Sequence, residues 1–329
     1  MTGALRWLRR WGVSLASLAG GFLALFVFRR GLPHVAWIIG YLLLLWLLFA
    51  VLTQVSQSLA ASARRRDRLV VTAVDYTVQT LYHGLLLFVL PAYYAAATLT
   101  SVNALFVALL VALALLATFD PWYHALVHPR PALGVAFFVI STFAALNVAI
   151  PLLGVRPYMG LLISAWVATV VATPALRRVF HWPWRTAFVS TAVAGIVAAG
   201  VAGVACRAIP PAPLFVARAY LQWHLGSLES LEPDPRAIPV DELRRRGVMA
   251  FTAIYAPAGL RQPVAHVWRQ NGDLVDVITF DAVAGGRREG YRTWSRKLTF
   301  PPDPVGPWTV EVMTTSGQLI GRLSFKVVA

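Results

Sequence analysis

The feature that most constrains this chain is the apolar stretch from Trp184 to Cys206, which holds Arg185 as its one charged residue. A run of this length is long enough to cross a bilayer as a helix. The residues before it form further apolar runs, whereas the residues after it alternate in polarity. The sequence therefore predicts two unlike parts, a membrane-embedded helical part followed by a water-exposed β-sheet domain.

Composition supports a membrane protein. Of the 329 residues, 58% are hydrophobic and only 13% are charged, which departs from the average of soluble domains. The formal net charge of +15 would suggest a nucleic-acid partner in a soluble protein. Much of the arginine flanks apolar runs, however, so we expect the lipid bilayer and no nucleic acid. The single cysteine, Cys206, excludes an intrachain disulfide and a cysteine-rich metal site.

Seven apolar runs predict a bundle of seven transmembrane helices. The runs cover residues 12–28, 35–52, 69–90, 101–119, 133–153, 158–176 and 186–206. Arginines are denser on one side of these spans, and the positive-inside rule then places the N-terminus in the cytoplasm. The expected location is the bacterial inner membrane, and the seventh span carries the C-terminal domain to the periplasm.

The expected domains are a seven-helix transmembrane domain over 1–206, a Pro-rich linker over 207–246 and a periplasmic β-sandwich domain over 247–329. Within the linker, Leu214–Leu228 predicts a short amphipathic helix at the membrane surface. From Gly247 onward, apolar and polar residues alternate and turn signals such as Asn271-Gly272 separate the runs. This pattern predicts a small, all-β antiparallel sandwich of the immunoglobulin-like kind.

Several motifs of the C-terminal part resemble a known family. They are Trp268 with Asn271-Gly272, the stretches Gly290–Ser295 and Gly306–Val312, Gly317-Gln318 and the closing Phe325–Val327. In this order they are similar to a bacterial domain of unknown function, number 2914. The resemblance implies a small β-sandwich of bacterial envelope proteins and transfers no catalytic residue.

Asp75, Gln79 and His83 lie four residues apart in the third expected span, and therefore on one helix face. Ionisable groups at membrane depth are costly and mark ion or proton paths, so a relay is one hypothesis. Alternatively, Asp75 lies near the end of the span, a few residues after Arg68, and is simply hydrated there.

Asp120, His124 and His128 repeat the four-residue spacing after the fourth expected span. A carboxylate with two imidazoles is a ligand set for zinc or iron. Alternatively, Asp120 caps a helix that begins with Pro121, and Pro129 ends it.

Basic and aromatic residues gather in one segment of the β-domain, at Arg287, Arg288, Tyr291, Arg292, Trp294 and Arg296. Such a patch could bind an anionic polymer, a lipid head group or an acidic partner. In the alternative interpretation Trp294 belongs to the core and the arginines form a solvated strand face.

No phosphate-binding loop, metalloprotease helix or nucleophile elbow occurs, so we expect neither an enzyme nor a cofactor. The predicted function is a non-enzymatic binding or assembly module of the bacterial envelope, or an accessory subunit of a membrane complex. A protein partner in the membrane or periplasm is expected, and the oligomeric state stays open. The alternatives are a small transporter or ion-coupled protein that uses the third span, and a membrane-bound metalloenzyme around His124.

Overall fold

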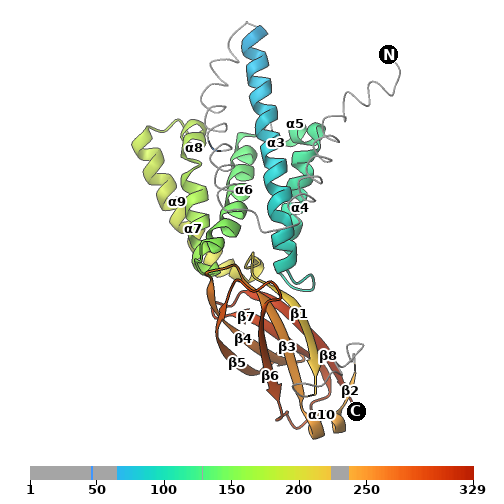
Figure 1. The fold of residues 1–329 in the computed structure, drawn as a ribbon. Helices are drawn as coiled ribbons and strands as arrows, with labels where there is room; N and C mark the ends of the chain where they lie inside the picture. Colours follow the sequence, from blue (N-terminus) through green and yellow to red (C-terminus); the bar gives the residue numbers. More distant parts are fainter. Residues whose placement is uncertain (1–45, 47–64, 128, 224–236) are drawn as a thin grey trace, which may run out of the picture. The chain divides into compact units, whose positions relative to one another are not determined.

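The computed structural model describes Trp46 and residues 65–127, 129–223 and 237–329. These residues form eight α-helices, one short 3-10 helix and eight β-strands (Figure 1). They divide into two compact units. The helical unit takes in residues up to 91, 107–150 and 159–204, and the β-sheet unit takes in residues 92–106, 151–158 and 205–329.

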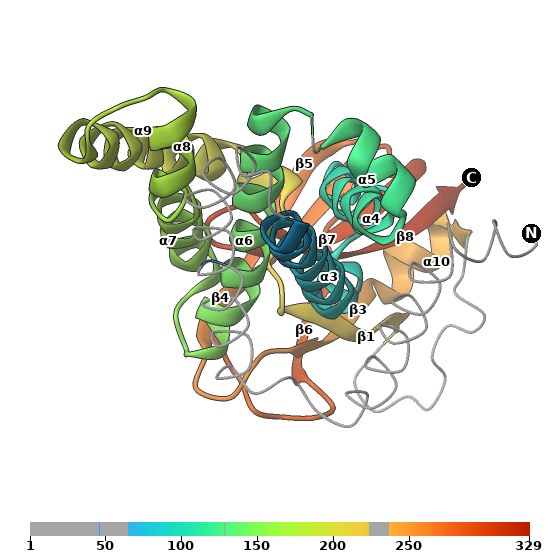
Figure 2. The same cartoon turned by 90° about the horizontal axis from the view of Figure 1, so that it is seen from above.

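The helical unit is built from apolar segments that often begin at a proline. Pro131 and Pro157 open α6 and α7, where the missing N–H of proline costs no hydrogen bond. In Figures 1 and 2, α3 lies beside α4, and α8 lies beside α9. The helices are α3 (Arg65–Ala96), α4 (Ala104–Thr118), α5 (Asp120–Leu126), α6 (Pro131–Leu152), α7 (Pro157–Val170), α8 (Thr173–Val179) and α9 (Trp184–Val204).

The prediction of a seven-helix bundle is wrong. Within the described ranges, only α6 and the stretch Trp184–Ala208 are both long and apolar enough to cross a membrane. Two further pairs qualify only if each bent pair is one span. They are α4 with α5, bent by 103°, and α7 with α8, bent by 45°. The described residues therefore hold two to four candidate spans.

The bends of the α4–α5 and α7–α8 pairs have a local cause. Pro121 and Pro174 lie in the first turn of α5 and α8, and proline has no backbone N–H to donate to the helix before it. The third expected span lies within α3, which is not among the candidate spans and carries Asp75, Gln79 and His83. The first two expected spans, 12–28 and 35–52, lie outside the described residues apart from Trp46.

The predicted location is corrected with the span count. An N-terminus in the cytoplasm and a C-terminal domain in the periplasm required an odd number of crossings, seven in all. The described residues hold two to four candidate spans. The predicted inner-membrane topology, which required seven crossings, is therefore wrong.

Two sheets form the β-sheet unit. The three-stranded sheet has the order β1-β3-β6 and the five-stranded sheet the order β2-β8-β7-β4-β5. All pairs are antiparallel except β2 with β8, which is parallel. Strand β2 lies outside the predicted domain 247–329, and the strands within that range pair only antiparallel. The strands are β1 (Phe215–Gln222), β2 (Ile238–Pro239), β3 (Val248–Tyr255), β4 (Arg261–Gln270), β5 (Asp273–Ala284), β6 (Tyr291–Lys297), β7 (Gly306–Thr314) and β8 (Leu319–Val328). A short helix, α10 (Val240–Arg246), precedes β3.

The core of this unit lies between the two sheets. Trp268 of β4 and Trp308 of β7 are fully buried, and they pack with Leu221 of β1 and Val248 and Ala250 of β3. Alternation along each strand turns every second side chain inward. Both sheets contribute side chains to one apolar cluster. The burial of these side chains from water therefore holds the two sheets together.

The hairpin between β4 and β5 forms at the predicted turn. Asn271 and Gly272 have φ angles of 52° and 93°, the left-handed pair that a two-residue hairpin turn requires. The segment Leu214–Leu228, by contrast, does not form the predicted amphipathic helix. Its described part forms β1, which pairs with β3 from Phe215 to Gln222.

Candidate functional site

The helical unit brings the two polar sets of the sequence together. The Asp120 carboxylate of α5 accepts hydrogen bonds from two side chains of α3. Tyr76 Oη donates to Oδ2 over 2.6 Å, and Gln79 Nε2 donates to Oδ1 over 2.7 Å. The two predicted clusters, which are about forty residues apart in the chain, thus form one site, which we call the α3–α5 polar cluster (Asp75, Tyr76, Gln79, His83, Thr118, Asp120 and His124).

A second contact closes the outer end of this cluster. His124 Nδ1 of α5 lies 4.0 Å from Asp75 Oδ2 of α3, and the His124 ring lies 6.5 Å from the Tyr76 ring. One residue of each predicted set therefore faces one residue of the other.

His83 forms the buried end of the cluster. Its Nδ1 lies 2.7 Å from Thr118 Oγ1, at the end of α4. The Thr118 hydroxyl donates its own proton to the Ala114 carbonyl over 2.7 Å, so its oxygen is left to accept from His83. Both His83 and Thr118 are buried.

Some buried polar atoms near the cluster have no hydrogen-bond partner among the described residues. They are Gln79 Oε1 and the Tyr82 hydroxyl, both of α3. A buried polar atom without a partner costs free energy, and it is uncommon outside functional or hydrated sites. The α3–α5 polar cluster is therefore not fully satisfied by its own side chains.

The metal-site prediction at Asp120, His124 and His128 is not supported by the described residues. Among them, no group of three or more His, Cys, Asp or Glu side chains is placed to hold a metal ion. Asp120 faces Tyr76 and Gln79, and His128 lies outside the described residues. The alternative interpretation of Asp120 as a helix cap is wrong too, because Phe119 holds that position without a side-chain hydrogen bond.

In the β-sheet unit, β6 decides between the two interpretations of Trp294. Thr293, Ser295 and Lys297 point inward and are buried, whereas Arg292, Trp294 and Arg296 are exposed. Trp294 is 47% exposed. The tryptophan therefore lies outside with the arginines rather than in the core.

The remaining members of the predicted patch lie at the start of β6 and in the loop before it. Arg287 places its guanidinium 5.0 Å from the centre of the Tyr291 ring, and Tyr291 packs against the core. Arg288 is exposed, and Arg292 forms an exposed ion pair with Glu289 over 3.3 Å.

Trp294 belongs to a row of aromatic side chains that crosses the three-stranded sheet. It lies opposite Phe251 of β3, which lies opposite Tyr220 of β1. Residues paired in this way project from the same face. The Tyr220 and Phe251 rings stack with centroids 4.6 Å apart.

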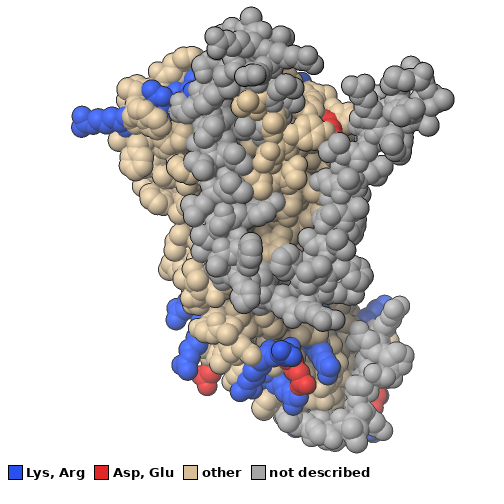
Figure 3. Space-filling view, turned by 45° about the horizontal axis from the view of Figure 1, so that its top comes forward, with Lys and Arg blue, Asp and Glu red and all other residues tan. Residues whose placement is uncertain are grey.

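Arginines flank this aromatic row. The next row holds Arg218 of β1 and Arg292 of β6, both paired with the small Ala253 between them. We call this surface the aromatic–arginine face (Arg218, Tyr220, Phe251, Arg292, Trp294 and Arg296). On the side of the molecule in Figure 3, basic side chains gather over the β-sheet unit, whereas the helical part is mostly uncharged.

Sequence reasoning missed half of this face. Arg218 and Tyr220 lie in the segment that was expected to be helical, and Phe251 lies in a strand whose partner was unknown. The available signal was the alternation Val216-Ala217-Arg218-Ala219-Tyr220, which fits a strand as well as a helix.

A polar network is buried between the two sheets. Both ring nitrogens of His266 on β4 form hydrogen bonds. Nε2 lies 2.9 Å from Thr252 Oγ1 of β3, and Nδ1 lies 2.8 Å from Ser295 Oγ of β6. Trp268 Nε1 donates to the same Ser295 oxygen over 3.1 Å. Burial lowers the pKa of His266 to about 4, so the ring is neutral at pH 7.

The His266–Ser295 pair also has the composition of a base and its nucleophile. His266 is 0% exposed and Ser295 is buried, so no substrate reaches either side chain. The arrangement therefore links the two sheets rather than performing catalysis.

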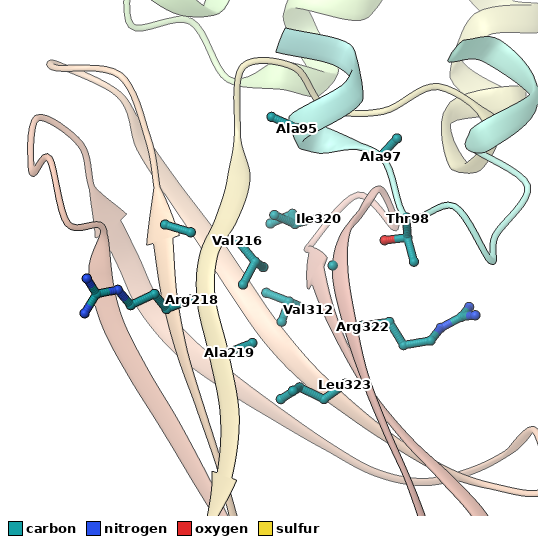
Figure 4. A pocket seen from close by; sticks show the side chains of 12 residues that line it. Ala95, Ala97, Thr98, Val216, Arg218, Ala219, Val312, Ile320, Arg322 and Leu323 are labelled. Carbon is teal, nitrogen blue, oxygen red and sulfur yellow. The ribbon is translucent and has the colours of Figure 1, made fainter. Parts of the chain in front are cut away.

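A small hollow of about 300 Å³ opens beside β1 and β8 (Figure 4). Val216, Val312, Ile320 and Leu323 give it an apolar lining, and Arg218 and Arg322 point away from it on opposite sides in Figure 4. Thr98 is the only uncharged polar side chain among the described residues that line it, so the hollow offers few groups that could hold a ligand.

The fold and the sites define a class of protein with apolar helices, a few of them long enough to span a membrane, joined to a β-sheet unit. The model of a family of unknown function (DUF5924) matches residues 2–250, and the chain belongs to that family. The model of a protein of unknown function (DUF2914) matches residues 261–327, which confirms the predicted resemblance of the C-terminal part. No curated protein and no solved structure matches the chain.

Proposed function

We propose that this protein is embedded in a membrane and that its β-sheet unit is a non-enzymatic binding module for an acidic protein partner. The observation that carries the proposal is the aromatic–arginine face. Aromatic side chains and arginine are enriched at the energetically important centres of protein interfaces. Here they form one continuous surface on an exposed side of a sheet.

The charges of this face favour an acidic partner. Among the described residues, Arg218 and Arg296 have no carboxylate partner, and Arg292 is paired only with the exposed Glu289. Opposite charge across an interface speeds association and excludes like-charged competitors. Trp294 supplies apolar area beside the cations, so the partner is expected to present acidic residues around an apolar one.

The surface of α9 supports membrane embedding. Large apolar side chains on this helix are more than half exposed, among them Phe188, Val193, Ile196 and Val201. In water such a surface would be unfavourable, whereas in lipid it needs no protein partner. The stretch Trp184–Ala208 is also one of the two single-helix candidate spans in the described part of the chain.

The test places a photoreactive phenylalanine analogue at Trp294 in the full chain in native membranes. We expect a cross-linked adduct with an acidic protein, and we expect Arg292→Glu with Arg296→Glu to abolish it by charge repulsion. The matched controls are the analogue at Leu274, an exposed residue of β5, and Lys326→Glu, an exposed charge reversal on β8. An adduct that forms equally from Leu274, or that survives reversal of both arginines, contradicts the proposal.

A second candidate function is a proton or cation relay through the α3–α5 polar cluster. It is favoured by the hydrogen bonds that join Tyr76 and Gln79 to Asp120, together with the unpartnered Gln79 Oε1 and Tyr82 hydroxyl. Buried ionisable and polar groups in membrane helices commonly mark such paths.

Proton flux into proteoliposomes, followed with a pH-sensitive dye, tests this second candidate. We expect flux for the native chain, a loss for Asp120→Asn, and no change for Thr80→Ala, which alters an exposed hydroxyl of α3. Native chain that conducts no protons or monovalent cations contradicts the relay.

A further inference from the structure

A groove of about 770 Å³ lies on the outer face of the five-stranded sheet, within the β-sheet unit. Strands β4, β7 and β8 form its floor, and the connection from Thr100 to Val102 and the residue Arg207 form its rim. The groove is thus on the other sheet from the aromatic–arginine face, and the two surfaces are independent.

The groove is lined by three guanidinium groups, those of Arg207, Arg269 and Arg322, and by one carboxylate, that of Glu311. Glu311 accepts from Arg269 Nε over 3.0 Å and from Arg322 Nη2 over 2.6 Å, so each of its oxygens holds one arginine. The side chains of Arg269 and Arg322 are thereby fixed in place on the floor. Arg207, in contrast, is exposed and has no carboxylate partner among the described residues.

Both arginines of the floor are also held by backbone carbonyls. Arg269 Nη1 donates to Gly272 O over 3.2 Å, and Arg322 Nη1 donates to Thr100 O over 3.4 Å. This bracing reduces the conformational entropy that the side chains would lose on binding a ligand. The groove therefore presents an ordered surface with an excess of positive charge.

The chain order places the rim of the groove at the polar end of apolar helices. Arg207 lies in the last residues of Trp184–Ala208, a candidate span. Thr100–Val102 lies in the connection from α3 to α4, and two apolar residues of this connection, Leu99 and Val102, are 64% and 60% exposed. Cations and exposed apolar side chains occur together where a protein meets the head-group region of a bilayer.

We propose that this groove binds a phosphate ester, and that the source is the head group of an anionic phospholipid. Arg207 and Arg322 supply N–H donors to the phosphate oxygens, since guanidinium pairs with phosphate through two parallel hydrogen bonds. Glu311 keeps Arg269 and Arg322 oriented, and Val102, Met313 and Leu319 offer apolar contact to the glycerol and acyl ends. The proposal concerns a different surface from the proposed binding of a protein partner and stands if that proposal fails.

The test titrates the purified full chain in an uncharged detergent with dihexanoylphosphatidylglycerol and follows binding by calorimetry. We expect saturable binding to the native chain, and a decrease in affinity of about tenfold or more for Arg207→Gln, which removes one charged bidentate contact. The matched control is Arg261→Gln, an exposed arginine of β4 outside the groove, with unchanged affinity. Arg322→Gln is also expected to weaken binding, but it frees Glu311, so Arg207→Gln decides the result.

The remaining probes distinguish the sources of the phosphate. Dihexanoylphosphatidylcholine, which has no net charge, is expected to bind weakly, and inorganic phosphate is expected to bind at least tenfold more weakly than phosphatidylglycerol. Inorganic phosphate that binds as tightly as the lipid, and depends on Arg207, overturns the lipid as the source. Native chain that binds neither probe, or Arg207→Gln that binds like the native chain, overturns the site itself.

Discussion

At the scale of single residues, His266 is the centre of a buried polar network between the two sheets. It joins Thr252 and Ser295 of the three-stranded sheet to β4 of the five-stranded sheet. Thr252 Oγ1 continues the network to Thr293 Oγ1 over 2.7 Å. A buried network of this kind specifies one register between two sheets, because any shift leaves polar groups unpaired.

Acidification is expected to destabilise the β-sheet unit through His266. Its folded pKa is about 4 and its unfolded pKa about 6.5, so between these values the unfolded state binds more protons. The free energy of unfolding therefore falls as pH is lowered from 6.5, by up to about 3 kcal/mol, and levels off below pH 4. Urea unfolding followed by β-sheet circular dichroism at several pH values measures this change.

The control for this pH dependence is His266→Asn, which is expected to be less stable at pH 7 and to lose most of the pH dependence between 6.5 and 4. Asp276 titrates in a different range, because its hydrogen bond with Lys297 lowers its pKa below the usual value. Its contribution is lost only at lower pH. An equal pH dependence in the native chain and in His266→Asn would exclude the histidine as the cause.

Ser295→Ala is expected to lower the free energy of unfolding by about 1–3 kcal/mol, because His266 Nδ1 and Trp268 Nε1 both lose their partner in a buried place. Ser324→Ala, an exposed serine of β8, is the matched control and is expected to change stability by less than about 0.5 kcal/mol. Chemical denaturation of both variants gives the comparison, and equal stabilities would remove the network from its proposed role.

At the scale of elements, turns and breaks decide where helices and strands end. Pro174 lies in the first turn of α8, inside the apolar run 158–176, and Pro121 lies in the first turn of α5, just after the run 101–119. The Asn271-Gly272 turn joins β4 to β5 and fixes which residues of the two strands face each other. Local backbone chemistry thus sets the register and the span count, while hydrophobicity sets the kind of element.

Gly272→Ala tests the turn. The φ of Gly272 is 93°, and a β-carbon there would meet no atom within 4 Å, so only the backbone conformation is penalised. We expect a loss of about 1–2 kcal/mol in the free energy of unfolding. Gly134→Ala in α6 is the matched control, since its β-carbon also meets no atom, and alanine is favourable in a helix. A neutral effect at Gly272 would contradict the assigned turn.

At the scale of the whole molecule, the β-sheet unit is assembled from distant parts of the chain. Besides residues 205–329, it takes in the connections 92–106 and 151–158. Asn103 Nδ2 donates to the Leu319 carbonyl over 3.4 Å, and Arg322 donates to the Thr100 carbonyl. The connections between helices are therefore part of this unit rather than free loops.

A soluble fragment that begins at Gly247 is expected to fold poorly. It lacks β1, which covers one edge of β3 and contributes the buried Leu221. An uncovered strand edge pairs with other chains, so this fragment is expected to aggregate. A fragment that begins at Ala205 keeps β1 and is expected to be monomeric in size-exclusion chromatography. Equal behaviour of the two fragments would contradict a structural role of β1.

The residues that sequence reasoning found best were those with a local signal. Alternation placed β7 and β8, and Asn271-Gly272 placed a hairpin turn. The four-residue spacing placed Asp75, Gln79 and His83 on one helix face and Asp120 and His124 on another. The contact between these two faces follows only from the tertiary structure. Tyr76 was missed because its importance comes only from its bond with Asp120, 44 residues away. The count of seven failed in the described residues because α3 is not among the candidate spans and two further apolar runs belong to bent helix pairs.

The sequence by itself determined that apolar helices precede a β-sheet part, since burial and alternation follow from the order of apolar and polar residues. Tertiary structure alone decided that Asp120 faces α3, that Trp294 lies outside in one row with Phe251 and Tyr220, and that Arg207, Arg269 and Arg322 line one groove. The physical reason is that these contacts join segments far apart in the chain. Which segments meet depends on the packing of whole elements, and no local pattern encodes it.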